Sequence, residues 1–286
     1  MNKTILAEKI YTVLLSPKWV RRIVHWLILR VIPRKVRILD TFDLILNPSD
    51  PVLSGAITFG VYEPFEQKVF QEKCREGFQV LDIGANVGLY TGIAATRVGT
   101  SGKVIAVEPY PDAFSYLEKL CAENHFEHVL RFNVAAGDSR KSGNLYLTKE
   151  NRGDCRIYDA AGNRPSIPIK MISMDDLLRE QSIGQIDLIK MDIQGAEGLA
   201  LRGLAKTLEQ PGALTIFSEF WPWGLRQAGT DPLEFLATFR DLGFNASIID
   251  EQKNKVTPLA DITTLIRQIP STEDGSRSYA NLIFYR

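Results

Sequence analysis

The chain has 286 residues, of which 45% are hydrophobic and 24% charged, and its formal net charge is zero. This length accommodates one large α/β domain with a small extension. A zero net charge excludes a global field that attracts nucleic acid, so no nucleic-acid partner is expected. The cysteines, Cys74, Cys121 and Cys155, are scattered without metal-binding spacing, which indicates reduced, inert thiols and a cytoplasmic location.

The first segment, residues 1–37, is apolar and basic, with nine lysines and arginines against one acid, Glu8. Its apolar runs are far shorter than the roughly 20 residues of a membrane span. We expect an amphipathic helix here, which either contacts a membrane surface or a lipid-linked substrate, or docks on the domain with its arginines solvated. Residues 1–58, this helix with added strands over 37–46, form a predicted N-terminal unit, and residues 59–286 form the main domain.

A strand, a glycine turn and a helix follow one another at residues 80–97. Val80 to Ile83 is an apolar run, and Gly84 and Gly88 follow it. Such a turn lets backbone N–H groups approach a ligand closely. A second apolar strand, 103–107, ends in Glu108, where an acid can bind ribose hydroxyls. The pattern is typical of the first half of a nucleotide-binding α/β unit.

The residues of the turn favour one cofactor. A dinucleotide fingerprint has the spacing G-x-G-x-x-G, whereas here Asn86 stands in place of the middle glycine. Asp82 would repel a pyrophosphate but suits an amine or a sulfonium. We therefore predict S-adenosylmethionine, with a nicotinamide dinucleotide or a ligand-free structural turn as alternatives. The predicted cofactor-binding residues of this unit are Asp82, Gly84, Asn86, Gly88 and Glu108.

Two further acids are candidate cofactor ligands. Glu63 precedes a predicted helix at 65–76, where it faces the pocket or caps the helix. Asp138 follows a predicted third strand, 129–135, where it meets the adenine amino group or serves as an ordinary turn aspartate. An inserted hairpin, with strands at 143–148 and 167–172, then either covers the pocket with its tip or is a plain surface excursion.

The last part of the chain predicts four more strands, at 186–193, 213–220, 246–249 and 279–285. Asp192 is the acid at the open end of the first of these, where doubly wound sheets bind ligands. A short helix capped by Ser173 precedes that strand, and Trp221 to Gly224 is a predicted aromatic loop. The last two strands lack a clear helix between them, so the final strand is expected to run antiparallel.

Three groups of residues give the chain a resemblance to the FkbM family of S-adenosylmethionine-dependent methyltransferases. They are Tyr62-Glu63-Pro64, the glycine motif Leu81 to Gly88, and Ile189 to Glu197, in which Gln194 replaces the family's usual glutamate. The resemblance implies a class I methyltransferase fold, Rossmann-like, with a seven-stranded sheet whose last strand is antiparallel. It also implies O-methylation of a sugar or another small-molecule hydroxyl.

Methyl transfer to an alcohol requires a group that accepts the hydroxyl proton. The catalytic residues that we predict are Asp192 and, second, Glu197, which could instead cap the following helix. No metal is expected, although Asp192 and Glu219 could share magnesium. The predicted function is therefore O-methylation of a small-molecule, sugar or glycolipid acceptor. A nicotinamide-dependent oxidoreductase and a non-catalytic binding module are the alternatives.

Overall fold

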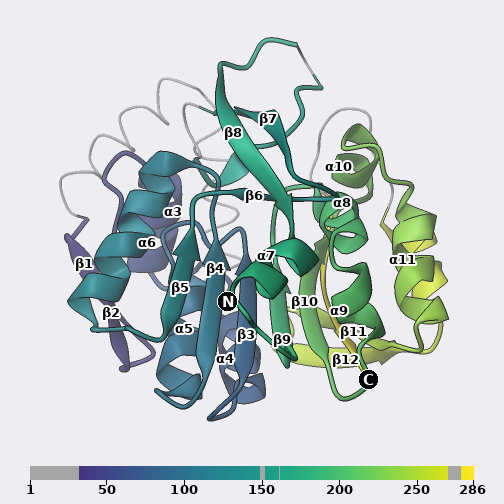
Figure 1. Cartoon of the computed structure of the whole chain (residues 1–286), viewed down its shortest axis with the longest axis horizontal. Coiled ribbons are helices and arrows are strands. Elements are labelled where there is room, and N and C mark those ends of the chain that lie inside the picture. The colour runs from purple at the N-terminus through teal and green to yellow at the C-terminus, as the bar shows by residue number, and fades with distance from the viewer. Residues whose placement is uncertain (1–31, 149–151, 161, 270–277) are drawn as a thin grey trace.

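The computed structural model describes residues 32–148, 152–160, 162–269 and 278–286. Eight strands form its main sheet: β3 (Gln79–Ile83), β4 (Lys103–Val107), β5 (Val129–Phe132), β9 (Leu188–Met191), β10 (Thr215–Phe220), β11 (Asn245–Asp250), β12 (Lys255–Leu259) and β13 (Ala280–Tyr285). Their order is β12-β11-β13-β10-β9-β3-β4-β5 (Figure 1).

The strands β5, β4, β3, β9 and β10 are parallel, and β13 lies antiparallel between β10 and β11. This confirms the predicted α/β class and the antiparallel final strand. The sheet has one strand more than the seven expected, because β12 pairs with β11 at the edge. Pro258 weakens the strand signal of this segment, but an edge position tolerates a proline.

Helices cover both faces of the sheet (Figure 1). Successive residues of a strand point to opposite faces of the sheet. Val80 and Val104 therefore belong to one hydrophobic core, and the next residue of each strand, Leu81 and Ile105, belongs to the other. The first core includes residues of α3 (Pro51–Thr58), α4 (Pro64–Lys73), α5 (Leu89–Val98) and α6 (Pro111–Glu123). The second includes residues of α7 (Met174–Glu180), α8 (Glu197–Arg202), α9 (Ala205–Glu209), α10 (Pro222–Gln227), α11 (Pro232–Asp241), η3 (Ile262–Thr264) and α12 (Leu265–Gln268).

The described part of the N-terminal region is a hairpin, β1 (Lys35–Ile38) with β2 (Phe42–Ile45), followed by the unpredicted helix α3. Phe42 is buried so closely against α5 that a Cβ on Gly92 would lie 2.3 Å from its ring. The basic helix, predicted within residues 1–37 between Pro17 and Pro33, lies almost entirely outside the described residues. Among those described, Lys35 pairs with Asp43 and Glu123. No described helix combines the length and apolarity that crossing a membrane requires.

A second sheet, in the order β6-β8-β7, consists of β6 (Ala135–Gly137), β7 (Lys141–Tyr146) and β8 (Ser166–Ser173). It stands above the edge at which the parallel strands end (Figure 1). The antiparallel pair β7 and β8 is the predicted inserted hairpin, with η2 (Arg152–Asp154) between them. The predicted end of the third strand, residue 135, was wrong, because β5 stops at Phe132. The next residue, Asn133, instead donates hydrogen bonds to the carbonyls of Glu108 and Pro109.

Two predictions about the helices that follow β9 and β10 need correction. The predicted aromatic loop at Trp221 to Gly224 contains the start of α10, because Pro222 at the first position suits a helix start. The single helix expected after Glu197 is divided into α8 and α9 at Gly203, where a Cβ would lie 2.0 Å from the carbonyl oxygen of Gly137. Ser173 caps α7 as predicted, accepting a hydrogen bond from the Asp176 N–H.

Candidate functional site

The glycine turn after β3 lies at the point where the strand order reverses, between β3 and β9. Gly84 has a φ of +85°, and a Cβ on it would lie 2.2 Å from the Asp192 carbonyl oxygen. Asn86 also adopts a left-handed φ, +50°. Ligands of doubly wound sheets bind at such switch points. The turn therefore packs directly against the end of β9, at the expected position of a ligand.

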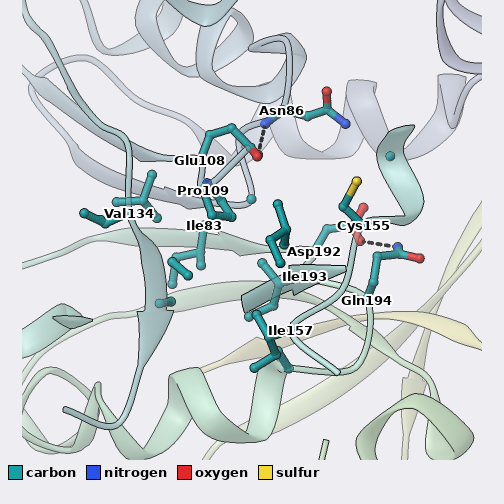
Figure 2. Close-up of a pocket in the computed structure, with 17 residues that line it drawn as sticks. Ile83, Asn86, Glu108, Pro109, Val134, Cys155, Ile157, Asp192, Ile193 and Gln194 are labelled. Atoms are coloured by element: carbon teal, nitrogen blue, oxygen red, sulfur yellow. Dashed lines mark hydrogen bonds between the residues drawn. The ribbon is translucent and has the colours of Figure 1, made fainter. Parts of the chain in front are cut away.

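Glu108 follows β4 and its carboxylate is fixed at both oxygens. It accepts one hydrogen bond from the Asn86 N–H at 2.9 Å (Figure 2). It accepts another from the Tyr110 N–H at 2.7 Å. Burial raises the pKa of Glu108 to about 7, against the effect of these two bonds. Because each carboxylate oxygen has a second lone pair, Glu108 retains the capacity to accept two more hydrogen bonds.

Two cavities meet at the glycine turn. The Glu108 cavity is lined by the Glu108 carboxylate and apolar side chains, including Val134 and Ile157 (Figure 2). The Lys190 cavity is lined by Tyr62, Asp82 and Lys190, among others. The residues that line both are Gly84, Asn86, Gly153, Asp192 and Gln194. A ligand that extends from one cavity into the other would therefore pass over the turn and Asp192.

Asp82 is almost fully buried on the Lys190 side. Its carboxylate accepts a hydrogen bond of 2.5 Å from the Thr91 hydroxyl. Burial raises the pKa of Asp82 to about 6, although this hydrogen bond opposes the shift. A cationic group bound next to Asp82 would lower this pKa and favour the carboxylate form.

Lys190 lies in the middle of β9 and is 2% exposed. Its ammonium forms a 3.0 Å ion pair with Glu66, which also accepts a hydrogen bond from Asn281. Burial alone would lower the pKa of Lys190, but the nearby carboxylates, Glu66 first, raise it above its ordinary value. A charged residue inside an apolar central strand was the available signal for this network, which the sequence analysis left without a role.

Glu63 belongs to the same buried network. It accepts hydrogen bonds from the Tyr90 hydroxyl at 2.9 Å and from Asn281 at 3.2 Å. Burial and the charge of Glu66 raise the pKa of Glu63 to about 8. Glu63 is not among the residues that line either cavity, although its neighbour Tyr62 is. Its backbone is left-handed, with a φ of +42°, and its side chain makes no cap of α4.

Three acids meet where β9 and β10 end. Asp192, Glu197 and Glu219 each place a carboxylate oxygen within 4.8 Å of the others. Asp192 also accepts a 3.0 Å hydrogen bond from the side-chain amide of Gln194, which a glutamate at position 194 could not donate. Glu197 is fully buried and accepts a 2.9 Å hydrogen bond from the Ile193 N–H, and burial raises its pKa to about 7. The structure therefore groups the two predicted catalytic acids.

The inserted segment between β7 and β8 contributes directly to the site. Cys155 and Ile157 line the Glu108 cavity, and the Tyr158 hydroxyl donates a hydrogen bond to the Gln194 carbonyl. Arg156 lies 4.7 Å from the ring centroid of Trp221. Burial raises the pKa of the Cys155 thiol to about 11, which agrees with an inert thiol. The sequence predicted an insertion that either covers the pocket or is a plain surface excursion, and none of these side chains was predicted to be functional.

Besides Glu63, two more of the predicted cofactor residues, Gly88 and Asp138, line neither cavity. Gly88 permits close approach of α6, since a Cβ on it would lie 2.4 Å from Leu120, and its role is thus in packing. Asp138 is exposed and pairs with Lys141 at 2.8 Å, which holds the pKa of Asp138 below its ordinary value. The expectation that Asp138 ends a strand of the main sheet was wrong, because β5 stops earlier and Asp138 follows β6.

Curated relatives match only parts of the chain. A protein-L-isoaspartate O-methyltransferase from Methanococcus maripaludis is 34% identical over 95 residues, 33% of this chain and 41% of that protein. The hexuronic acid methyltransferase AglP from Haloferax volcanii is 24% identical over 142 residues, 50% of this chain and 56% of that protein. The chain thus spans about half the length of these curated relatives.

Solved structures show a distant likeness. An FkbM methyltransferase from Methylobacillus flagellatus has a TM-score of 0.43 and 13% identity, over 93% of this chain and 59% of that one. Fibrillarin from Aeropyrum pernix with bound S-adenosylmethionine has a TM-score of 0.41 and 12% identity, over 74% and 67%.

The match that decides the family is a family model. The model of the methyltransferase FkbM domain matches residues 82–246, which is more than half of the chain. The match begins at Asp82 and includes the glycine turn, Glu108 and Asp192. It confirms the resemblance drawn from the sequence and, with it, S-adenosylmethionine as the cofactor of this fold. The chain belongs to the FkbM methyltransferase domain family.

Proposed function

We propose that this protein transfers the methyl group of S-adenosylmethionine to a hydroxyl of a small-molecule, sugar or glycolipid acceptor. The observation that carries the proposal is the meeting of two cavities at Gly84, with Glu108 lining one, Lys190 lining the other and Asp192 lining both. The cofactor would extend from the Glu108 cavity toward Asp82, and the acceptor would approach beside Asp192, which lines both cavities.

The Glu108 cavity fits a phosphate-free adenosyl group. Its described lining includes no lysine or arginine that would neutralise a pyrophosphate, and it includes apolar side chains, such as Val134 and Ile157, against which an adenine ring can pack. Glu108 would accept the two ribose hydroxyls through its remaining lone pairs. Asp82, which lines the neighbouring cavity, suits the cationic end of the cofactor. These features argue against a nicotinamide dinucleotide.

When bound, S-adenosylmethionine supplies an activated methyl group on a sulfonium. The residues of this chain then have two tasks, to position the acceptor hydroxyl and to accept its proton. Asp192 lines both cavities, and its carboxylate accepts a hydrogen bond from the Gln194 side chain. We therefore assign to Asp192 the role of accepting the proton of the acceptor hydroxyl. Glu197 accepts a hydrogen bond from the backbone next to Asp192 and would hold that segment in place.

A sugar acceptor is the preferred class within this proposal. AglP is named as a hexuronic acid methyltransferase, which supports this preference. Tyr158, which donates a hydrogen bond to the Gln194 carbonyl, and its ring neighbour Trp223 are aromatic side chains of a type that stacks on sugar rings. Radiolabelled S-adenosylmethionine offered with a panel of uronic acids, neutral sugars and non-sugar alcohols tests this. Labelled sugar that wild type forms and Asp192→Asn does not would support the proposal; no labelled product from any acceptor would count against it.

A further inference from the structure

The three acids at the ends of β9 and β10 form an arrangement that the proton-transfer role of Asp192 does not explain. Asp192, Glu197 and Glu219 come from a strand end, a helix start and a neighbouring strand, and one oxygen of each lies within 4.8 Å of the others. Glu197 is fully buried and Glu219 is 9% exposed. Like charges at this separation repel strongly when water is largely excluded.

Glu197 supplies a second, independent observation. One of its oxygens accepts a hydrogen bond from the Ile193 N–H, whereas the other is buried and has no hydrogen-bond partner among the described residues. A buried carboxylate oxygen without a partner is costly, and in native proteins such groups usually have a ligand or a functional role. Glu197 is one of the three acids of the cluster, so a group bound there could supply the missing partner.

Two basic side chains near the cluster, Lys190 and Arg156, form ion pairs with other acids. The Lys190 ammonium pairs with Glu66 at 3.0 Å and lies over the Tyr90 ring. Arg156 pairs with Asp154 at 2.6 Å and lies over the Trp221 ring. Within the described ranges, no lysine, arginine or histidine forms an ion pair with Asp192 or Glu197. A bound cation would supply positive charge to these two carboxylates.

We propose that Asp192, Glu197 and Glu219 bind one divalent cation of the magnesium or manganese type. Three carboxylates supply the hard oxygen ligands that these cations prefer, and they leave coordination positions for water or a ligand. Asp192 lines both cavities, so the cation would lie at their border.

The cation also suggests an acceptor chemistry, and this step rests on the proposed function. A cation at the border of the cavities would hold two adjacent oxygens of the acceptor, such as vicinal hydroxyls or a hydroxyl beside a carboxylate. Coordination would lower the pKa of the bound hydroxyl and orient its oxygen. Chelating acceptors would then be preferred over simple alcohols.

Manganese binding to the full chain, stripped of metal with a chelator, tests the site without any cofactor or acceptor. Electron paramagnetic resonance of free Mn²⁺ should show one saturable site per chain at neutral pH. Glu219→Gln and Glu197→Gln should each weaken binding by about tenfold or more, since each removes one charged ligand. The matched control is Glu234→Gln, which changes an exposed acid on α11 and should leave the affinity unchanged.

Absence of saturable Mn²⁺ binding in the wild type would overturn the inference and would indicate that the three acids share a proton instead. Equal affinity in wild type and Glu219→Gln would overturn it as well, and this variant decides the question if Glu197→Gln does not fold. Calorimetry with S-adenosylhomocysteine separates the two proposals. Cofactor binding without metal binding removes only the metal site, and metal binding without cofactor binding removes only the proposed function.

Discussion

Two buried carboxylates of the site, those of Glu108 after β4 and Glu197 at the start of α8, differ in how many of their oxygens accept hydrogen bonds. Glu108 accepts backbone hydrogen bonds at both oxygens, whereas Glu197 accepts one and keeps a second oxygen buried without a hydrogen bond among the described residues. A carboxylate held at both oxygens cannot turn, so it can recognise a rigid pair of hydroxyls. We interpret this contrast as a division of the proposed site, with cofactor binding on the β3–β4 side and chemistry on the β9–β10 side.

Asp192→Asn gives the largest expected effect and tests the chemical side. Turnover should fall by roughly 10²–10⁴-fold, because the variant cannot accept a proton or hold a cation as a carboxylate does. Affinity for S-adenosylhomocysteine, measured by calorimetry, should stay within a few-fold of wild type. A variant with unchanged turnover would remove Asp192 from the reaction and with it the contrast between the two sides.

Lys190→Met tests whether the buried network supports the cleft. The substitution leaves Glu66 as an uncompensated buried charge, so the free energy of unfolding should fall by about 3–5 kcal/mol. Chemical denaturation measures this loss. Lys253→Met is the matched control, since it breaks an exposed pair with Asp250 and should change stability little. Equal stability of the two variants would refute the assigned role of the network.

Gly84→Ala tests the close contact between the turn and β9. An added Cβ would lie 2.2 Å from the Asp192 carbonyl and would also occupy a left-handed backbone. We expect a loss of about 2–4 kcal/mol in stability and much weaker cofactor binding, from overpacking and strain together. Gly243→Ala separates the two causes: Gly243 has a φ of +78° with nothing within 4 Å of its Cβ position. If both variants melt alike, the contact is unimportant.

Glu108→Gln gives the smallest effect and sharpens the binding side. Cofactor affinity should fall by about tenfold, the loss of one charge-assisted bond pair. Burial raises the pKa of Glu108 to about 7, so the carboxylate form becomes dominant above that pH. Wild-type affinity for S-adenosylhomocysteine should therefore strengthen as pH rises through about 7, by at most tenfold per pH unit.

The same titration has the opposite sign for the free protein. Because the folded state keeps the Glu108 proton up to about pH 7 and the unfolded state releases it near 4.5, this group makes the free protein less stable as pH rises between these values. The pH dependence of cofactor binding should be lost in Glu108→Gln. A variant that keeps the wild-type profile would show that another group carries it.

The strand, glycine turn and terminal acid were predictable because they depend on neighbours in sequence. The apolar run before Gly84 and the acid after the next strand require no knowledge of the rest of the chain. Asp138 shows the limit of this reasoning, since an error of three residues in the end of β5 placed it in the wrong sheet. Strand ends depend on hydrogen bonds such as those of Asn133, which the sequence pattern does not show.

Long-range pairings could not be predicted in the same way. Asn281 reaches Glu66 across 215 positions, and Glu219 joins Asp192 and Glu197 only because β9 and β10 are neighbours. From the sequence, no metal was expected, and only Asp192 and Glu219 were considered as a possible pair of ligands. Their charges were visible, but their separation depends on strand register and on the helix start at Glu197.

A crystal structure of the chain with S-adenosylhomocysteine would show where the cofactor binds. We predict the ribose hydroxyls on the Glu108 carboxylate, the adenine among the apolar residues of the Glu108 cavity and the thioether sulfur next to Asp192. An adenosyl group bound away from both Gly84 and Glu108 would contradict this prediction.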